Sequence, residues 1–201
     1  MVFHMEEALR HLRRRDPALK AIISQVGPFD IDYHPASFHS LAQSIVYQQL
    51  SGKAAATILG RLTSRCQVQR LTPNSLLTLN EADYRAAGIS TQKAASLLDL
   101  AARTQSGEIR FAALRRKTDE EIIAELTRVR GIGVWTAQMF LLFALRRPDV
   151  FPVLDLGVRN GMKKVYGLGD QARHEDFAAI AEPWRPWRSV GSWYMWRSLE
   201  I

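Results

Sequence analysis

Apolar residues recur at intervals of three and four along most of this chain, the spacing that lines one face of an α-helix. Strict alternation of apolar and polar residues, which is typical of a half-buried strand, is nearly absent. In the segment 91–104, for example, Ala94, Leu97 and Ala101 share one face. The segment 134–145 is apolar on most sides, which predicts a central buried helix. The pattern therefore predicts an all-α protein of roughly ten to twelve helices.

Residues that favour helix ends place several of the predicted boundaries. Thr72 precedes a proline and Ser90 precedes the segment 91–104, so both are expected to cap helices through their side-chain oxygens. Thr118 and Glu121 have the spacing of a capping box, in which each side chain binds the other residue's backbone N–H. The helix that this box opens is expected to end at Arg130.

Two glycines follow that predicted end, in the sequence Gly131-Ile132-Gly133, and another helix is expected from Val134. Glycine permits a positive φ and lets the backbone approach a phosphate closely. The N-terminus of the second helix offers free N–H groups and the positive end of its dipole to an anion. An ordinary turn with a glycine C-cap would show the same pattern. The favoured interpretation is a helix–hairpin–helix that holds a DNA strand without reading its bases.

A lone acid, Asp155, lies one helix length downstream, after the apolar and proline-containing segment 150–154. Aspartate at a helix start most often acts as an N-cap. A carboxylate placed beside a bound DNA strand can also act as an acid or a base. Both roles are compatible in one residue, so Asp155 is the candidate catalytic group.

Composition and net charge indicate the kind of molecule that the protein binds. The chain has 201 residues and a net charge of +7, with 27 Lys and Arg against 20 Asp and Glu, which favours a polyanionic partner. Cys66 is the single cysteine, so no disulfide within the chain is expected. The sequence also has no cluster of Cys and His that could bind zinc or an iron–sulfur cluster. Neither a signal peptide nor an apolar run long enough to span a membrane is present. We therefore expect an intracellular protein, cytoplasmic or nuclear according to the cell, with no membrane partner.

Five motifs together resemble one protein family. The segment 129–137 resembles the hairpin of the helix–hairpin–helix (HhH-GPD) DNA glycosylases, and Asp155 stands where that superfamily carries its catalytic aspartate. The segments 43–51, 88–94 and 184–189 are similar to the alkylated-base branch, DNA-3-methyladenine glycosylase II of the AlkA type. The helical motifs begin close to the first residue. The chain therefore resembles the compact form, without the sheet-containing N-terminal domain that such enzymes can carry.

The resemblance implies an architecture and an activity. It implies two helical lobes flanking a cleft that binds DNA, one formed by residues 46–150 and the other by 1–45 together with 151–201. It also implies a hydrolase that breaks the N-glycosidic bond of alkylated purines, of the 3-methyladenine and 7-methylguanine type, and so starts base excision repair. Bifunctional relatives carry a lysine where this chain has Trp135, and an indole cannot act as an amine nucleophile. We therefore expect a monofunctional enzyme that leaves an abasic site.

The resemblance also assigns roles to residues. Asp155 would stabilise the positive charge that develops on the sugar. Residues expected to line the base pocket are Trp135 and Trp196, then Tyr47, Met139, Trp193 and Tyr194, although each could instead pack in the core. Residues expected to contact DNA are Gln49 as the wedge that holds the duplex open, and Ser51, Lys53, Gly131, Gly133 and Thr136. Further phosphate contacts are expected from Lys93, Arg130 and Arg159.

No cofactor is expected to be required, but the resemblance implies a monovalent cation, Na⁺ or K⁺, on the backbone carbonyls of Thr127, Val129 and Ile132. The expected partner is double-stranded DNA containing alkylated bases, bound by a monomer. Two alternatives stay open. One is a helix–hairpin–helix protein that binds damaged DNA without catalysis. The other is a glycosylase for deaminated or oxidised bases.

Overall fold

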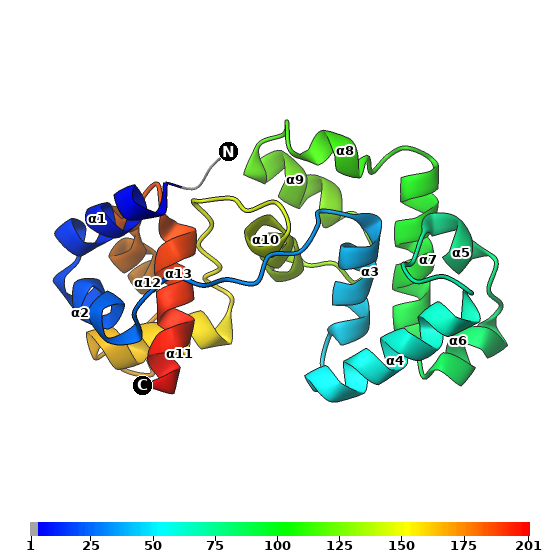
Figure 1. Cartoon of the computed structure of the whole chain (residues 1–201), viewed down its shortest axis with the longest axis horizontal. Helices are drawn as coiled ribbons and strands as arrows, with labels where there is room; N and C mark the ends of the chain where they lie inside the picture. Colours follow the sequence, from blue (N-terminus) through cyan, green and yellow to red (C-terminus); the bar gives the residue numbers. More distant parts are fainter. Residues whose placement is uncertain (1–3) are drawn as a thin grey trace. The chain divides into compact units, whose positions relative to one another are not determined.

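The computed structural model describes residues 4–201. Residues 1–3, part of the segment where no signal peptide is expected, lie outside that range. Within it the structure has thirteen α-helices, two short 3-10 helices and no strand, so the all-α prediction is confirmed. The elements, labelled in Figure 1 where there is room, are α1 (Met5–Arg15), α2 (Pro17–Val26), α3 (Phe38–Tyr47), α4 (Gly52–Arg65), α5 (Pro73–Leu77), α6 (Glu81–Ala87), α7 (Thr91–Gln105), α8 (Phe111–Leu114), α9 (Asp119–Leu126), α10 (Val134–Phe143), α11 (Leu156–Tyr166), α12 (His174–Ala181), η1 (Glu182–Trp184), α13 (Arg188–Arg197) and η2 (Ser198–Glu200).

The chain divides into two compact units. Unit 1 comprises residues 1–33 and 141–201, and unit 2 comprises residues 34–140. These boundaries differ from the expected ones at residues 46 and 150. The helix α3 belongs to unit 2 because it packs on α4 and α7. The segment after residue 140 belongs to unit 1, where the Ser189 hydroxyl donates to the carbonyl of Arg147 at 2.6 Å.

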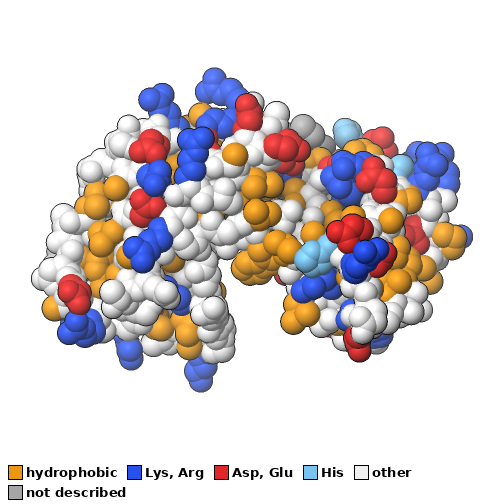
Figure 2. Space-filling model, turned by 180° about the vertical axis from the view of Figure 1, so that it is seen from behind, with side chains coloured by type: hydrophobic (Ala, Val, Ile, Leu, Met, Phe, Trp, Pro, Cys, Tyr) orange, Lys and Arg blue, Asp and Glu red, His pale blue; other side chains and the backbone are white. Residues whose placement is uncertain are grey.

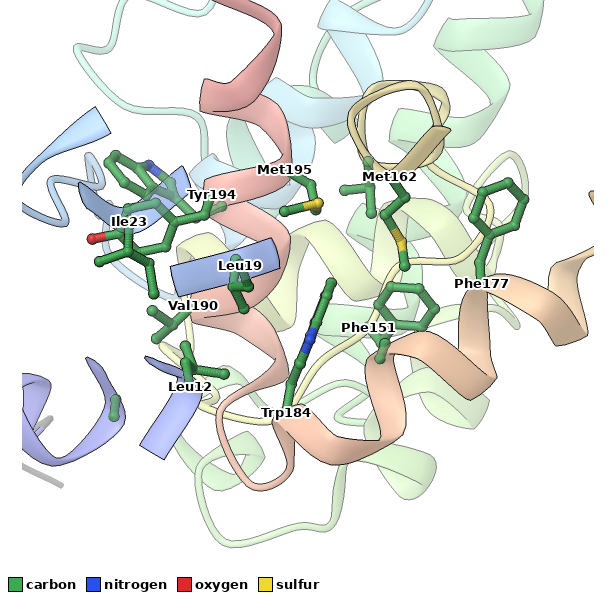
Figure 3. Close-up of a cluster of buried hydrophobic side chains, with 14 residues drawn as sticks. Leu12, Leu19, Ile23, Phe151, Met162, Phe177, Trp184, Val190, Tyr194 and Met195 are labelled. Carbon is green, nitrogen blue, oxygen red and sulfur yellow. The ribbon is translucent and has the colours of Figure 1, made fainter. Parts of the chain in front are cut away.

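Unit 1 is built around a core of apolar side chains from α1, α2, α11, α12, η1 and α13 and from the loop that holds Phe151, and Figure 3 labels ten of them. Trp184 is fully buried, and its ring meets that of Phe151 edge to face, with centroids 6.0 Å apart. The indole N–H of Trp184 donates to the carboxylate of Asp16 at 2.8 Å, and the hydroxyl of Tyr166 donates to the same oxygen at 2.7 Å. These bonds satisfy a buried charge that would otherwise be costly.

Unit 2 is arranged around α7, which packs on α5, α3 and α6, as Figure 1 shows. The predicted caps are confirmed: Thr72, Ser90 and Thr118 each accept a backbone N–H from the residue three positions later. The predicted end at Arg130 is wrong, because α9 ends at Leu126 and the next four residues form turns. The short helix α8 was not expected.

No helix among residues 4–201 combines the length and apolarity that crossing a bilayer requires.

Candidate functional site

The hairpin between α9 and α10 is shaped by contacts with α7. Gly131 has φ +76°, and a Cβ at this position would lie 2.5 Å from the hydroxyl oxygen of Ser96, so both conformation and space require glycine. The backbone N–H of Arg130 donates to a carboxylate oxygen of Asp99 at 2.8 Å. A Cβ at Gly133 would meet nothing within 4 Å, which leaves the backbone open to a close approach from outside.

A tight turn joins α3 to α4 in the same unit. The N–H of Leu50 donates to the carbonyl of Tyr47 at 3.3 Å, Gln48 has φ −51° and ψ 130°, and Gln49 has φ +57°. These values describe a type II turn, which favours glycine where Gln49 stands. A non-glycine residue in this conformation costs about 1 kcal/mol or more, and persists where the surroundings fix it.

The side chain of Gln48 connects this turn to the hairpin. Its amide nitrogen donates to the carbonyl of Gly131 at 2.9 Å and lies 3.5 Å from the hydroxyl oxygen of Thr136. Thr136 is buried, with 4% of its surface exposed. The Thr136 side chain is therefore part of this internal contact, so the expectation that it touches DNA directly is not favoured.

The turn and the start of α10 line one groove of about 730 Å³. Trp135 is 39% exposed in it, although a tryptophan is usually largely covered. Leu50, also 39% exposed, was missed by the sequence analysis. Three of the predicted base-pocket residues thus come together here. The lining residues are Ser44, Tyr47, Gln48, Gln49, Leu50, Gly131, Trp135, Thr136 and Met139.

Asp155, in unit 1, is the N-cap of α11. Its Oδ1 accepts the backbone N–H of Val158 at 2.8 Å and the indole N–H of Trp196 at 2.7 Å. Two donors on one oxygen hold the half-buried carboxylate in a single orientation. Leu154 and Leu156, on either side of it, are 44% and 63% exposed. An oriented carboxylate among exposed apolar side chains is suited to act on a partner molecule.

Trp196 thus lies next to the carboxylate and directs its N–H toward it. The indole stacks on Phe143, with ring centroids 5.6 Å apart and an angle of 19° between the planes. A Cβ at Gly157 would lie 2.8 Å from this ring, so glycine is required for the indole to pack over the start of α11. Gly157 was missed by the sequence analysis. Its spacing of four from Gly161 on one helix was the signal that could have found it.

Trp193 and Tyr194 are buried in the core of unit 1, so the packing alternative is favoured for both. Trp193 is 7% exposed, and its ring centroid lies 4.8 Å from that of Phe29. The hydroxyl of Tyr194 donates to the carbonyl of Gly27 at 2.9 Å, and burial raises its pKa above the ordinary value. A base-pocket role for either would need these contacts to break.

Two expected DNA-contact residues lie at the start of α4. Ser51 is the N-cap, and its hydroxyl accepts the N–H of Ala54 at 3.4 Å. Lys53 is exposed. In unit 1, Arg159 approaches the ring of His174, with 3.4 Å between their nitrogens.

Side chains of the motif 184–189 bind residues 149 and 150, which precede Asp155 in the chain. The guanidinium of Arg188 pairs with Asp149 at 2.7 Å, and that of Arg185 pairs with the other oxygen of the same carboxylate, also at 2.7 Å. The N–H of Val150 donates to the hydroxyl of Ser189 at 2.9 Å. The motif therefore serves to anchor the chain before the candidate catalytic residue.

The backbone carbonyls that were expected to bind a monovalent cation differ in their hydrogen bonding. The carbonyl of Val129 accepts the N–H of Ile132 at 3.1 Å, while those of Thr127 and Ile132 accept no hydrogen bond in the part of the chain that the structure describes. Backbone carbonyls can replace the hydration shell of such an ion. Within residues 4–201, no group of three His, Cys, Asp or Glu side chains is arranged to hold a metal.

Positive charge is spread over the surface. On the face drawn in Figure 2, Lys and Arg side chains are scattered, with Asp and Glu among them. The net charge of +7 therefore provides a general attraction to a polyanion.

Comparisons with known proteins agree on one family. The model of the HhH-GPD superfamily base excision DNA repair proteins matches residues 42–186. DNA-3-methyladenine glycosylase 1 of Schizosaccharomyces pombe is 31% identical over 210 residues, which cover 100% of this chain and 90% of that protein.

Solved structures show the same similarity. A DNA-3-methyladenine glycosidase from Bacillus halodurans aligns with a TM-score of 0.87 and 32% identity, covering 94% of this chain and 87% of that one. The S. pombe 3-methyladenine DNA glycosylase in complex with abasic DNA aligns with a TM-score of 0.85 and 31% identity, covering 97% of each chain.

Proposed function

Because this chain belongs to the HhH-GPD superfamily of base excision DNA repair proteins, we propose that it is a monofunctional DNA glycosylase for alkylated purines. The reaction is hydrolysis of the N-glycosidic bond of bases such as 3-methyladenine and 7-methylguanine in double-stranded DNA. The three similar proteins described above are named 3-methyladenine glycosylases or glycosidases, which supports this substrate class.

The hairpin binds the DNA backbone in this proposal. The N-terminus of α10 carries the positive end of the helix dipole, which favours a phosphate. The absence of a side chain at Gly133 lets the phosphate approach. Lys53 adds a positive charge, and a Na⁺ or K⁺ ion on the carbonyls of Thr127, Val129 and Ile132 would supply another to the same turn.

Asp155 carries the chemistry. As the bond from the sugar to the base nitrogen breaks, its electron pair leaves with the base and positive charge develops on the sugar. A fixed carboxylate stabilises this charge and orients the water that attacks the sugar carbon. The single observation that carries the proposal is the orientation of this carboxylate by Trp196 and the N-terminus of α11.

The groove lined by Tyr47, Trp135 and Met139 is the candidate base pocket. An alkylated purine is positively charged, and an indole face is the best aromatic surface for a cation. The target nucleotide must leave the base stack to reach such a pocket, and the side chain of Gln49 is the candidate to fill the gap. Trp135 stands where an amine nucleophile would be needed for strand cleavage, so the product is an intact strand with an abasic site.

The test is base release from methylated duplex DNA by the wild type and by Asp155→Asn. Asparagine keeps an oxygen for both N–H donors, so the fold should be retained. We expect release to fall by about a hundredfold or more, because the charge that stabilises the transition state is lost. Wild-type product should be uncut until alkali treatment. Asp170→Asn, at a carboxylate that is 97% exposed, is the matched control and should retain full activity.

The same assay separates the two alternatives. A protein that only binds damaged DNA would bind equally well in both forms and release no base. A glycosylase for deaminated or oxidised bases would leave methylated DNA intact and release uracil, hypoxanthine or 8-oxoguanine from matching duplexes. Either result would contradict the alkylpurine assignment.

A further inference from the structure

We propose that Lys93 is a positioning residue that holds the turn at residues 47–50 in its strained conformation, so that the Gln49 side chain is presented to the duplex. This inference rests on the proposed function, because it assigns a purpose to the turn within base excision. It also departs from the sequence-based expectation that Lys93 contacts a phosphate.

Two short hydrogen bonds carry the inference. The ammonium of Lys93 donates to the carbonyl oxygens of Val46 and Gln48, both at 2.7 Å. These carbonyls lie at the C-terminal end of α3, where the last carbonyls of a helix have no partner within it and the dipole is negative. Bonds with a charged donor are about twice as strong as neutral ones. Burial lowers the pKa of this ammonium, and the two carbonyl oxygens that it contacts favour its charged form.

The position of Lys93 on its own helix does not favour a local role for its charge. It is the third residue of α7, and its backbone N–H donates to the capping hydroxyl of Ser90 at 3.3 Å. A cation in the first turn of a helix is destabilised by the positive end of the helix dipole. The side chain therefore gains its stabilisation from the end of α3, across the gap between two helices.

The turn that it holds is restrained from a second side. The Gln48 amide donates to the carbonyl of Gly131, which ties the turn to the hairpin. Gln49 thus projects from a backbone fixed by α7 and by the hairpin together. A wedge must be rigid, because a mobile turn would lose conformational entropy on entering the duplex and weaken opening. This explains why a glutamine is kept in a conformation that favours glycine.

The experiment compares Lys93→Met, Lys93→Arg and the control Lys20→Met in single-turnover base release. Lys20 is exposed on α2 and has no place in the site. Two duplexes are used: one with a paired 7-methylguanine, and one with the same lesion opposite an abasic-site analogue, where less pairing must be broken. On the paired duplex we expect Lys93→Met to lose about tenfold or more in rate, since a small misplacement is costly. On the unpaired duplex the loss should stay within about threefold.

The arginine variant should recover most of the rate on the paired duplex, because a guanidinium keeps charged donors for the same carbonyls. An equal loss on both duplexes would overturn the inference, since Lys93 would then serve the fold or the chemistry in general. A salt dependence of binding that weakens by about one unit of slope in Lys93→Met would overturn it as well, because Lys93 would then be a phosphate contact.

A second readout does not depend on activity. The Leu50 N–H, which is bonded to the Tyr47 carbonyl, should exchange with solvent faster in DNA-free Lys93→Met than in the wild type or Lys20→Met. Unchanged exchange would contradict the inference even if the enzyme proves active. If the wild type releases no base but Leu50 exchanges faster in Lys93→Met, the positioning role of Lys93 is supported and only the proposed function is contradicted.

Discussion

At the scale of single residues, the side chains of the candidate site combine a structural role, such as helix capping or packing, with a role in the proposed reaction. Asp155 caps a helix, as an acid at a helix start predicts, and the same carboxylate is oriented by Trp196. The sequence predicted only one of the two roles of Trp196. Its residue type suggested a base pocket, but the hydrogen bond from its ring to Asp155 depends on the packing of α13 against α11. Contacts between distant helices leave no local pattern.

Trp196→Phe should separate the stacking of this indole on Phe143 from its hydrogen bond to Asp155. Phenylalanine keeps a ring to stack on Phe143 but cannot donate to Asp155, so the carboxylate loses one of its two fixing bonds. We expect base release to fall by about tenfold or more, because orientation of a reacting group contributes strongly to rate. Thermal unfolding should change little. If Trp196→Phe is fully active while Trp196→Leu is not, the ring face rather than the N–H is what matters.

At the scale of helices and turns, the sequence predicted caps well and contacts between helices poorly. Thr72, Ser90 and Thr118 cap as expected because capping depends on neighbours three residues apart. The end of α9 was misplaced by four residues because Arg130 donates its backbone N–H to Asp99 on α7, a contact far along the chain. The same limit explains why Lys93 was assigned to phosphate rather than to α3.

The close contact of α11 with α13 yields a stability prediction. A Cβ at Gly161 would collide with the backbone carbonyl of Met195. Gly161→Ala should therefore lower the free energy of unfolding by about 1–3 kcal/mol, measured by denaturant titration. The control is Gly60→Ala in α4, where a Cβ meets nothing within 4 Å. That change should raise stability by about 0.5–1 kcal/mol, and equal effects of the two substitutions would contradict the packing argument.

The start of α3 should respond to pH through His39. Its Nδ1 accepts the N–H of Leu71 at 3.0 Å, and burial, with the charge of Arg70, lowers the pKa of the ring. In the unfolded chain the ring takes up a proton below its ordinary pKa of about 6.5. The unfolded state then binds more protons than the folded one, so stability should fall as the pH drops from 7 toward 5. The drop in unfolding free energy should be smaller in His39→Gln, and an unchanged pH dependence would contradict this assignment.

At the scale of the whole molecule, the fold class and the family followed from the sequence, whereas the division into units did not. The predicted boundaries at residues 46 and 150 were set by motifs, which mark function rather than packing. The structure sets them at 33/34 and 140/141, where the contacts between residues separate into two sets. The second of these boundaries falls inside α10, a continuous helix that no composition change interrupts.

Unit 1 is made from two stretches of chain separated by the whole of unit 2, and this has a consequence for biosynthesis. Residues 34–140 make their contacts mostly among themselves, so this stretch can begin to pack as it leaves the ribosome. The helices α1 and α2 pack on each other, but the rest of their apolar surface is covered only once η1, α11 and α13 have been translated. At about 5–20 residues per second, that wait is on the order of ten to thirty seconds. During that interval Leu12, Leu19 and Ile23 lack the later side chains that cover them in the folded chain, and exposed apolar surface of this kind is what chaperones bind.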